Sequence, residues 1–119
     1  MTGEVDSRGT PIVRLTFGGR DWVAVIDTGF DGDLELPEVL APHFPKSSAG
    51  PSRTTLAAGR VIEEELFVVE FPFDGEIIEA QTSFAPTDEI VIGTRLLRSY
   101  RLEVNFVTRT VLLERIPRS

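Results

Sequence analysis

The chain has 119 residues, of which 41% are hydrophobic and 26% are charged, a composition typical of a folded globular protein that excludes an intrinsically disordered chain. Its formal net charge of -7 opposes binding to the phosphate backbone of DNA or RNA. The absence of cysteine excludes disulfide bonds, thiolate zinc sites and a cysteine nucleophile.

The length of the chain predicts a single domain over residues 1–119. The N-terminal segment 1–6 has neither a basic region nor an apolar run, so it does not resemble a signal peptide. No segment reaches the roughly 20 apolar residues that a membrane-spanning helix needs. We therefore expect a cytoplasmic protein without a membrane partner.

Alternating apolar and polar residues predict a hairpin in the first third of the chain. Segment 12–17 alternates, Gly18-Gly19 interrupts the pattern, and segment 22–26 is a continuous apolar run. Segment 27–33 consists of turn-forming residues. The buried strand is therefore expected to end in a tight loop.

The middle of the chain predicts a helical turn and two more hairpins. Segment 37–41 begins with proline, which the first helical position tolerates. Segment 46–51 has the serine, glycine and proline composition of a linker. The turn at 57–60 precedes a long strand-like run at 61–71, and the dipeptide Asp74-Gly75 is typical of a two-residue hairpin turn.

The last third of the chain predicts a short strand, a short helix and a final hairpin. Segment 90–92 is apolar, and segment 94–98 consists of helix-forming residues. This pattern repeats that of segment 23–40, so we expect the two parts to be structurally related. Segments 102–106 and 111–113 are expected to pair. The fold class is therefore all-β with one or two short helices.

One tripeptide carries candidate chemistry. Asp27-Thr28-Gly29 is the only aspartate followed by Thr or Ser and then Gly, and it directly follows five apolar residues. The ordinary interpretation is an Asx-type turn that ends a strand. Its position after a buried strand favours a catalytic carboxylate.

Hydrolysis of an amide without a metal or a nucleophilic side chain needs one group to deprotonate water and another to protonate the carbonyl oxygen. Two carboxylates that share one proton perform both steps. The other aspartates lack the context of Asp27, so the second carboxylate is expected from a second chain, with a two-fold axis through the site. The sequence therefore favours a homodimer that acts on a peptide or protein substrate and needs no cofactor.

The segment Asp27 to Leu34 resembles the retropepsin-like aspartic peptidases, in particular a small prokaryotic group with an Asp-Thr-Gly-Phe-x-Gly-Asp stretch. The resemblance extends to Val91-Ile92-Gly93, which matches the family's two apolar residues and glycine before a helix. It implies a closed β-barrel of the acid-protease type and an aspartic endopeptidase activity. Asp27 is implied as the catalytic residue, and Thr28 and Gly29 as support of the active-site loop.

The same resemblance implies a substrate cleft and a mobile flap. The implied cleft residues are Phe30, Asp31, Ala58, Gly59, Ile92 and Gly93, of which Ala58 and Gly59 belong to the hairpin around 57–60. A plain surface hairpin is an equal interpretation of that segment. Arg95 is a candidate ion-pair partner of Asp31. Phe30 and Thr94 differ from the retroviral residues at these positions.

Two other functions remain open from the sequence. A catalytically inactive dimerisation or peptide-binding module would keep the same fold, because fold alone does not establish activity. A monomeric β-barrel for a small ligand would use Asp27 only to end a strand. His43, the sole histidine, has no partner at metal-ligand spacing, so no metal site is predicted.

Overall fold

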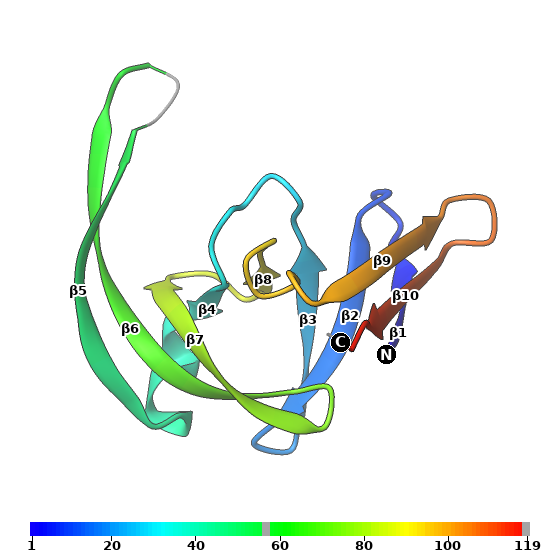
Figure 1. Ribbon diagram of the computed structural model, residues 1–119, viewed down its shortest axis with the longest axis horizontal. Helices are drawn as coiled ribbons and strands as arrows, with labels where there is room; N and C mark the ends of the chain where they lie inside the picture. Colours follow the sequence, from blue (N-terminus) through cyan, green and yellow to red (C-terminus); the bar gives the residue numbers. More distant parts are fainter. Residues whose placement is uncertain (56–57, 118–119) are drawn as a thin grey trace.

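The computed structural model describes residues 1–55 and 58–117, which form ten strands and one short 3₁₀ helix. All ten strands belong to one sheet, in the order β5-β6-β7-β4-β8-β3-β2-β1-β10-β9 (Figure 1). The elements are β1 (Thr2–Val5), β2 (Pro11–Phe17), β3 (Arg20–Ile26), β4 (Leu34–Pro37), η1 (Glu38–His43), β5 (Lys46–Thr55), β6 (Val61–Phe73), β7 (Glu76–Ala85), β8 (Ile90–Ile92), β9 (Tyr100–Asn105) and β10 (Thr110–Arg115).

The mostly β architecture is as predicted, but the expected closure of the sheet into a barrel is not observed. The sheet begins with β5 and ends with β9, and these two strands do not pair within the described residues. A barrel requires its first and last strands to hydrogen-bond to each other. Here β5 and β6 form a projecting arm on the left of Figure 1, whereas β9 lies on the right, so the two edges stay apart.

The predicted hairpins are confirmed. β2 pairs with β3, β5 with β6, β6 with β7, and β9 with β10, all antiparallel. The turn between β6 and β7 has Asp74 at φ 52° and Gly75 at φ 79°. Two consecutive positive φ angles match the twist of the flanking strands, which explains the strong hairpin signal of this dipeptide.

Three local predictions are corrected. Segment 46–51 is not a linker but the first part of β5, because its backbone pairs with β6 despite an irregular register between Ser48 and Gly50. Segment 94–98 forms turns, not a helix, because its few successive turn bonds do not propagate. β1 has no counterpart in the prediction. The helical turn after β4 is confirmed as η1.

The buried core gathers under the middle of the sheet. Leu34, Leu36, Ile90 and Ile92 on β4 and β8 are at most 1% exposed. Phe71 on β6 is fully buried and packs against two other phenylalanine rings at centroid distances of 5.3 and 5.6 Å. Burial of this apolar surface is the main stabilising contribution to the sheet. It therefore fixes the strands that carry the loop after β3.

The central strands β3 and β8 are parallel and end at the same edge of the sheet, here called the loop edge. Ile26 on β3 lies opposite Ile92 on β8, and Leu34 at the start of β4 lies opposite Ile92 on its other side. The loop 27–33 and the turn that begins at Gly93 therefore both leave from this edge. The repeat of strand, turn and helix expected from the sequence is only partly present, because both segments have a strand followed by a loop but segment 94–98 lacks a helix like η1.

Among residues 1–55 and 58–117, no helix is long and apolar enough to cross a bilayer. No three potential ligands of the His, Cys, Asp or Glu types converge on a metal position in that same part of the chain.

Candidate active site

The carboxylate of Asp27 stands at the surface, directly after β3. The backbone N–H of Asp27 donates to the carbonyl oxygen of Ile92 (3.0 Å), which ties the loop to β8. The backbone N–H of Gly29 donates to Oδ1 of Asp27 (2.9 Å), so the Asx-type turn of the ordinary interpretation is present. Asp27, Thr28 and Gly29 are all exposed. The turn therefore orients a carboxylate that remains open to solvent.

The loop 27–33 is braced from the side by the turn that follows β8. The backbone N–H groups of Gly93, Thr94 and Arg95 donate to the carbonyl oxygens of Asp33 (3.0 Å), Phe30 (2.8 Å) and Gly32 (3.2 Å), respectively. Three successive donors on one segment thus hold three carbonyls of the other. Because these bonds are between backbones, they fix the path of the Asp27 loop independently of side-chain rotamers.

At Gly93 the two segments lie too close for a side chain, which predicts a large effect of a single methyl group. A Cβ at Gly93 would overlap the carbonyl oxygen of Gly32 and lie 2.8 Å from the carbonyl oxygen of Phe30. Gly93→Ala is expected to lower the free energy of unfolding by about 2–3 kcal/mol in urea denaturation, since the backbones must separate.

The matched control is Gly29→Ala, whose added Cβ would meet only Oδ1 of Asp27, at 3.2 Å, among the described atoms. A carboxylate at the end of a side chain moves more easily than backbone. We expect a change of less than about 1 kcal/mol. Equal losses in the two variants would show that the backbone approach at Gly93 is not the cause.

Phe30 is half-buried and its ring lies between the two segments. Atoms of this ring would be 2.7 Å from a Cβ at Gly32 and 2.8 Å from a Cβ at Gly93. Both glycines thus leave room for the ring. In the described chain, Phe30 fills the space between the loop and the turn, which accounts for a large residue at this position.

Arg95 pairs with Asp33, which corrects the sequence-based partner Asp31. Nη1 of Arg95 lies 2.9 Å from Oδ2 of Asp33. The same oxygen accepts a bond from the backbone N–H of Gln81 on β7 (2.8 Å). Asp33 is 4% exposed, whereas Asp31 is exposed. The buried carboxylate of Asp33 needs an ion-pair partner, because an unpaired buried charge destabilises the folded protein.

The sequence did not single out Asp33, and its second oxygen is unusual. Oδ1 of Asp33 is buried without a hydrogen-bond partner among the described residues, and Nη1 of Arg98 lies 4.0 Å from it. Its signals in the sequence were its place as the last residue of the Asp-Thr-Gly-Phe-x-Gly-Asp stretch and its position directly before the apolar strand β4. Asp33 therefore connects the loop, the turn after β8 and β7 through one side chain.

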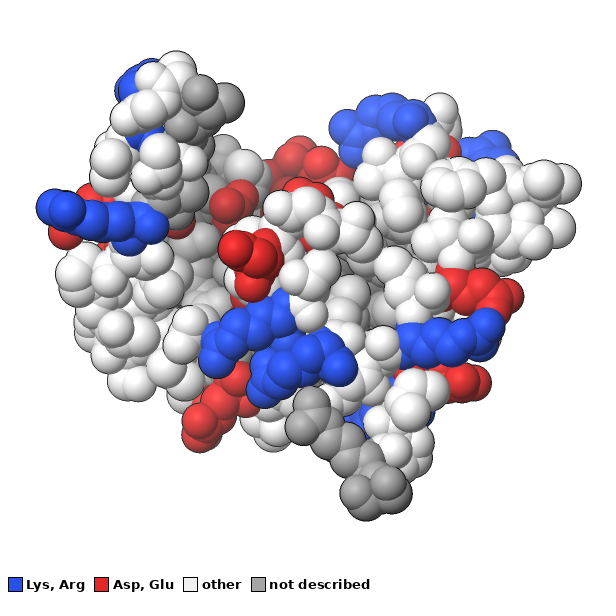
Figure 2. Space-filling view, turned by 45° about the horizontal axis from the view of Figure 1, so that its top comes forward, with Lys and Arg blue, Asp and Glu red and all other residues white. Residues whose placement is uncertain are grey.

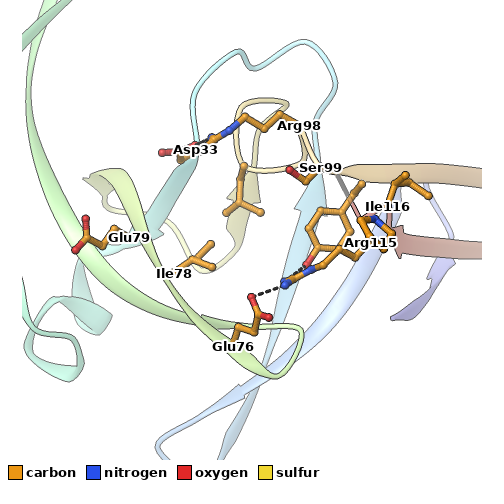
Figure 3. A pocket seen from close by; sticks show the side chains of 11 residues that line it. Asp33, Glu76, Ile78, Glu79, Arg98, Ser99, Arg115 and Ile116 are labelled. Carbon is orange, nitrogen blue, oxygen red and sulfur yellow. Dashed lines mark hydrogen bonds and ion pairs between the residues drawn. The ribbon is translucent and has the colours of Figure 1, made fainter. Parts of the chain in front are cut away.

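Asp33 also lines a cavity of about 310 Å³. In Figure 3, Asp33 and Arg98 lie at one end, and Glu76 and Arg115 meet at the other. Nη2 of Arg115 also donates to the hydroxyl of Tyr100 (2.8 Å). Asp27 is not among the lining residues, so the cavity is separate from the exposed carboxylate.

The remaining predicted cleft residues lie in two places. Ala58 and Gly59 are exposed and follow β5 near the end of the projecting arm; Ala57 lies outside the described residues. Ile92 is fully buried and Gly93 is buried, beneath the Asp27 loop. Ile92 acts there through its carbonyl oxygen. A shared cleft formed by these residues stays a prediction.

The pKa of Glu35 on β4 is affected by a carboxylate of the projecting arm. Burial raises the pKa of the Glu35 carboxyl from 4.5, and the nearby negative charge of Glu64 on β6 raises it further. A charge acts in this way only at short range. Glu64 on the arm therefore lies near Glu35 on β4, and Figure 2 shows acidic side chains in the hollow between the arm and the body.

This shift predicts a pH-dependent effect of Glu35→Gln. Because the folded-state pKa of Glu35 is above its unfolded value, the group makes the folded protein less stable as the pH rises through that range. The variant is expected to melt at a higher temperature than wild type at about pH 7, and the difference should vanish at about pH 3. The exposed Glu114→Gln removes the same charge and is the control; an equal gain there would attribute the effect to net charge.

Solved structures of aspartic proteases resemble this chain. A retropepsin-like aspartic protease from Rickettsia conorii matches with a TM-score of 0.65 at 14% identity, over 95% of this chain and 88% of that chain. The fold is retropepsin-like. The simian foamy virus (mac) protease matches this retropepsin-like chain with a TM-score of 0.53 at 18% identity, over 73% of this chain and 91% of that chain.

The foamy viral protease-reverse transcriptase in complex with an RNA/DNA hybrid also matches, with a TM-score of 0.57 at 17% identity over 79% of this chain. The retropepsin-like chain spans only 13% of that longer chain. No protein-family model and no curated protein matches the sequence. The likeness is thus one of fold at low sequence identity.

Within the described part of this retropepsin-like chain, no hydrogen bond or ion pair joins the Asp27 side chain to another carboxylate. One copy therefore presents one braced, exposed carboxylate at its loop edge.

Proposed function

We propose that the chain is one subunit of a homodimeric aspartic endopeptidase, in which two copies of Asp27 activate water for peptide hydrolysis. The observation that supports this most directly is the exposed Asp27 carboxylate, which accepts the backbone N–H of Gly29, while the backbone N–H of Asp27 donates to the carbonyl oxygen of Ile92 at the end of a buried strand. It occurs in a chain whose fold is retropepsin-like.

The proposed chemistry divides the work between two identical groups. Two carboxylates a few ångströms apart share one proton, because both cannot ionise cheaply. The charged one takes a proton from water, and the protonated one donates to the carbonyl oxygen of the substrate. In a two-fold dimer the loop edges of the two copies face each other, so the partner copy contributes the second Asp27. No cofactor takes part.

The projecting arm supports an extended peptide as the substrate. In Figure 1, β5 and β6 extend toward the same upper side of the molecule as the loop after β3. An arm in this place can close over a bound peptide and exclude water. Thr28, Phe30 and Asp31 then belong to the cleft floor of the dimer, with Ala58 and Gly59 above it.

A peptide library tests the proposal. The protein is incubated with mixed peptides at pH values from mildly acidic to neutral, at concentrations where sedimentation shows a dimer, and products are identified by mass spectrometry. The expected result is cleavage at defined bonds by wild type. Absence of cleavage from every peptide by a proven dimer would support the inactive dimerisation or peptide-binding module, and a monomer at all concentrations would contradict the shared site.

A further inference from the structure

The turn between β9 and β10 exposes two adjacent apolar side chains. Phe106 is 63% exposed and Val107 is 94% exposed. The turn itself is ordered by polar contacts: Oδ1 of Asn105 accepts the backbone N–H groups of Val107 (3.0 Å) and Thr108 (3.1 Å). The apolar pair, here called the hairpin tip, is therefore held outward by a built turn.

A second contact fixes the hairpin tip to the body of the molecule. The guanidinium of Arg109 donates through Nε and Nη2 to the carbonyl oxygen of Val5 on β1 (3.1 and 3.0 Å). The backbone N–H of Val5 in turn donates to the carbonyl oxygen of Arg109 (3.1 Å). An exposed apolar surface on a fixed support is typical of a protein contact, since little conformational entropy is lost on binding.

The strand register places the hairpin tip at the loop edge. A row of paired residues runs across five strands: Val25 on β3, Ile12 on β2, Glu4 on β1, Thr110 on β10 and Asn105 on β9. At one end of the row, β3 continues from Val25 into the Asp27 loop. At the other end, β9 continues from Asn105 into the hairpin tip, on the same side of the row. Four strand spacings separate them, about 19 Å. Figure 1 shows both at the upper side of the molecule.

Charge favours the hairpin tip as the place where a second copy of this chain approaches. Two copies with a net charge of -7 each repel one another. Segment 105–110 contains no carboxylate, and its single charged group, Arg109, is bound to Val5. Figure 2 shows the right-hand projection, where this hairpin ends, as mainly uncharged surface. Close approach of two copies is therefore least unfavourable there.

We propose that Phe106 and Val107 form an apolar contact between two copies of this chain, beside the paired Asp27 loops. This inference rests on the proposed function, because a single copy supplies one carboxylate and the site is incomplete without its partner. In a two-fold dimer the contact occurs twice, because each copy places its hairpin tip against the equivalent surface of the other copy. One substitution then changes the interface twice.

Sedimentation equilibrium of Val107→Glu tests the contact. Each dimer would bury two glutamates against the partner copy without a compensating positive charge, so the dimer dissociation constant is expected to rise at least about 100-fold. Phe106→Ser, which removes the ring without adding charge, is expected to raise it about 10-fold. Far-UV circular dichroism should match wild type in both, because these side chains are exposed.

The matched control is Ile77→Glu, another exposed apolar residue (73%), which lies on β7 directly after the turn between β6 and β7. Its dissociation constant should equal that of wild type. Unchanged dimers of Val107→Glu and Phe106→Ser would overturn the contact, even if wild type cleaves peptides. Dissociation of Val107→Glu together with an inactive wild-type dimer would uphold the contact and reject the peptidase.

Discussion

Replacement of Asp27 with Asn is expected to lower the rate of peptide cleavage at least about 10³-fold. The amide cannot take a proton from water, and each dimer loses both carboxylates at once. The fold should persist, because the amide oxygen can still accept the N–H of Gly29 that Oδ1 accepts in the wild type. The measurement is single-turnover hydrolysis of a library-selected peptide by equal concentrations of dimer.

Asp88→Asn is the matched control for Asp27→Asn, because Asp88 is exposed, lies outside the proposed cleft and lacks an ion-pair partner in the described part of the chain. This variant removes the same charge and should hydrolyse the peptide at the wild-type single-turnover rate. Cleavage at the wild-type rate by Asp27→Asn would reject the catalytic assignment. Mixed dimers of one wild-type copy and one Asp27→Asn copy provide a further check: they should be as inactive as the dimer of two Asp27→Asn copies if the two carboxylates act as one unit.

Replacement of Asp33 with Ala is expected to lower the free energy of unfolding by about 3 kcal/mol. The substitution removes the partner of Arg95 and leaves the backbone N–H of Gln81 without its acceptor. Both contacts hold the end of the Asp27 loop against β7 and the turn after β8. Urea denaturation at about pH 7 measures the loss, and the slope of the unfolding free energy against urea concentration should be unchanged.

Asp31→Ala tests whether position rather than charge causes this loss. Its carboxylate is exposed, so the expected change is within about 0.5 kcal/mol. A double-mutant cycle with Arg95→Met then isolates the Asp33–Arg95 pair, which lies 2.9 Å apart. Additive effects of Asp33→Ala and Arg95→Met would show that the ion pair contributes nothing and that the bond from Gln81 carries the effect.

Local signals in the sequence were sufficient to predict most of the strands. The apolar run before Asp27, the interruption at Gly18-Gly19 and the dipeptide Asp74-Gly75 each report backbone preferences of neighbouring residues. Such preferences act within a few residues, so they identify hairpins. They failed at 46–51, where pairing with β6 overrides a linker-like composition, and at 94–98, where contacts with the loop 27–33 replace helical bonds.

By itself the sequence determined a mostly β chain, its hairpins and one aspartate in a turn after a buried strand. Only the tertiary structure decided that Arg95 binds Asp33 and not Asp31, that the sheet stays open between β5 and β9, and that the hairpin tip shares an edge with Asp27. The physical reason is distance along the chain. Asp33 and Arg95 are 62 residues apart, and their contact depends on how β4 and β8 pair, which no local preference specifies.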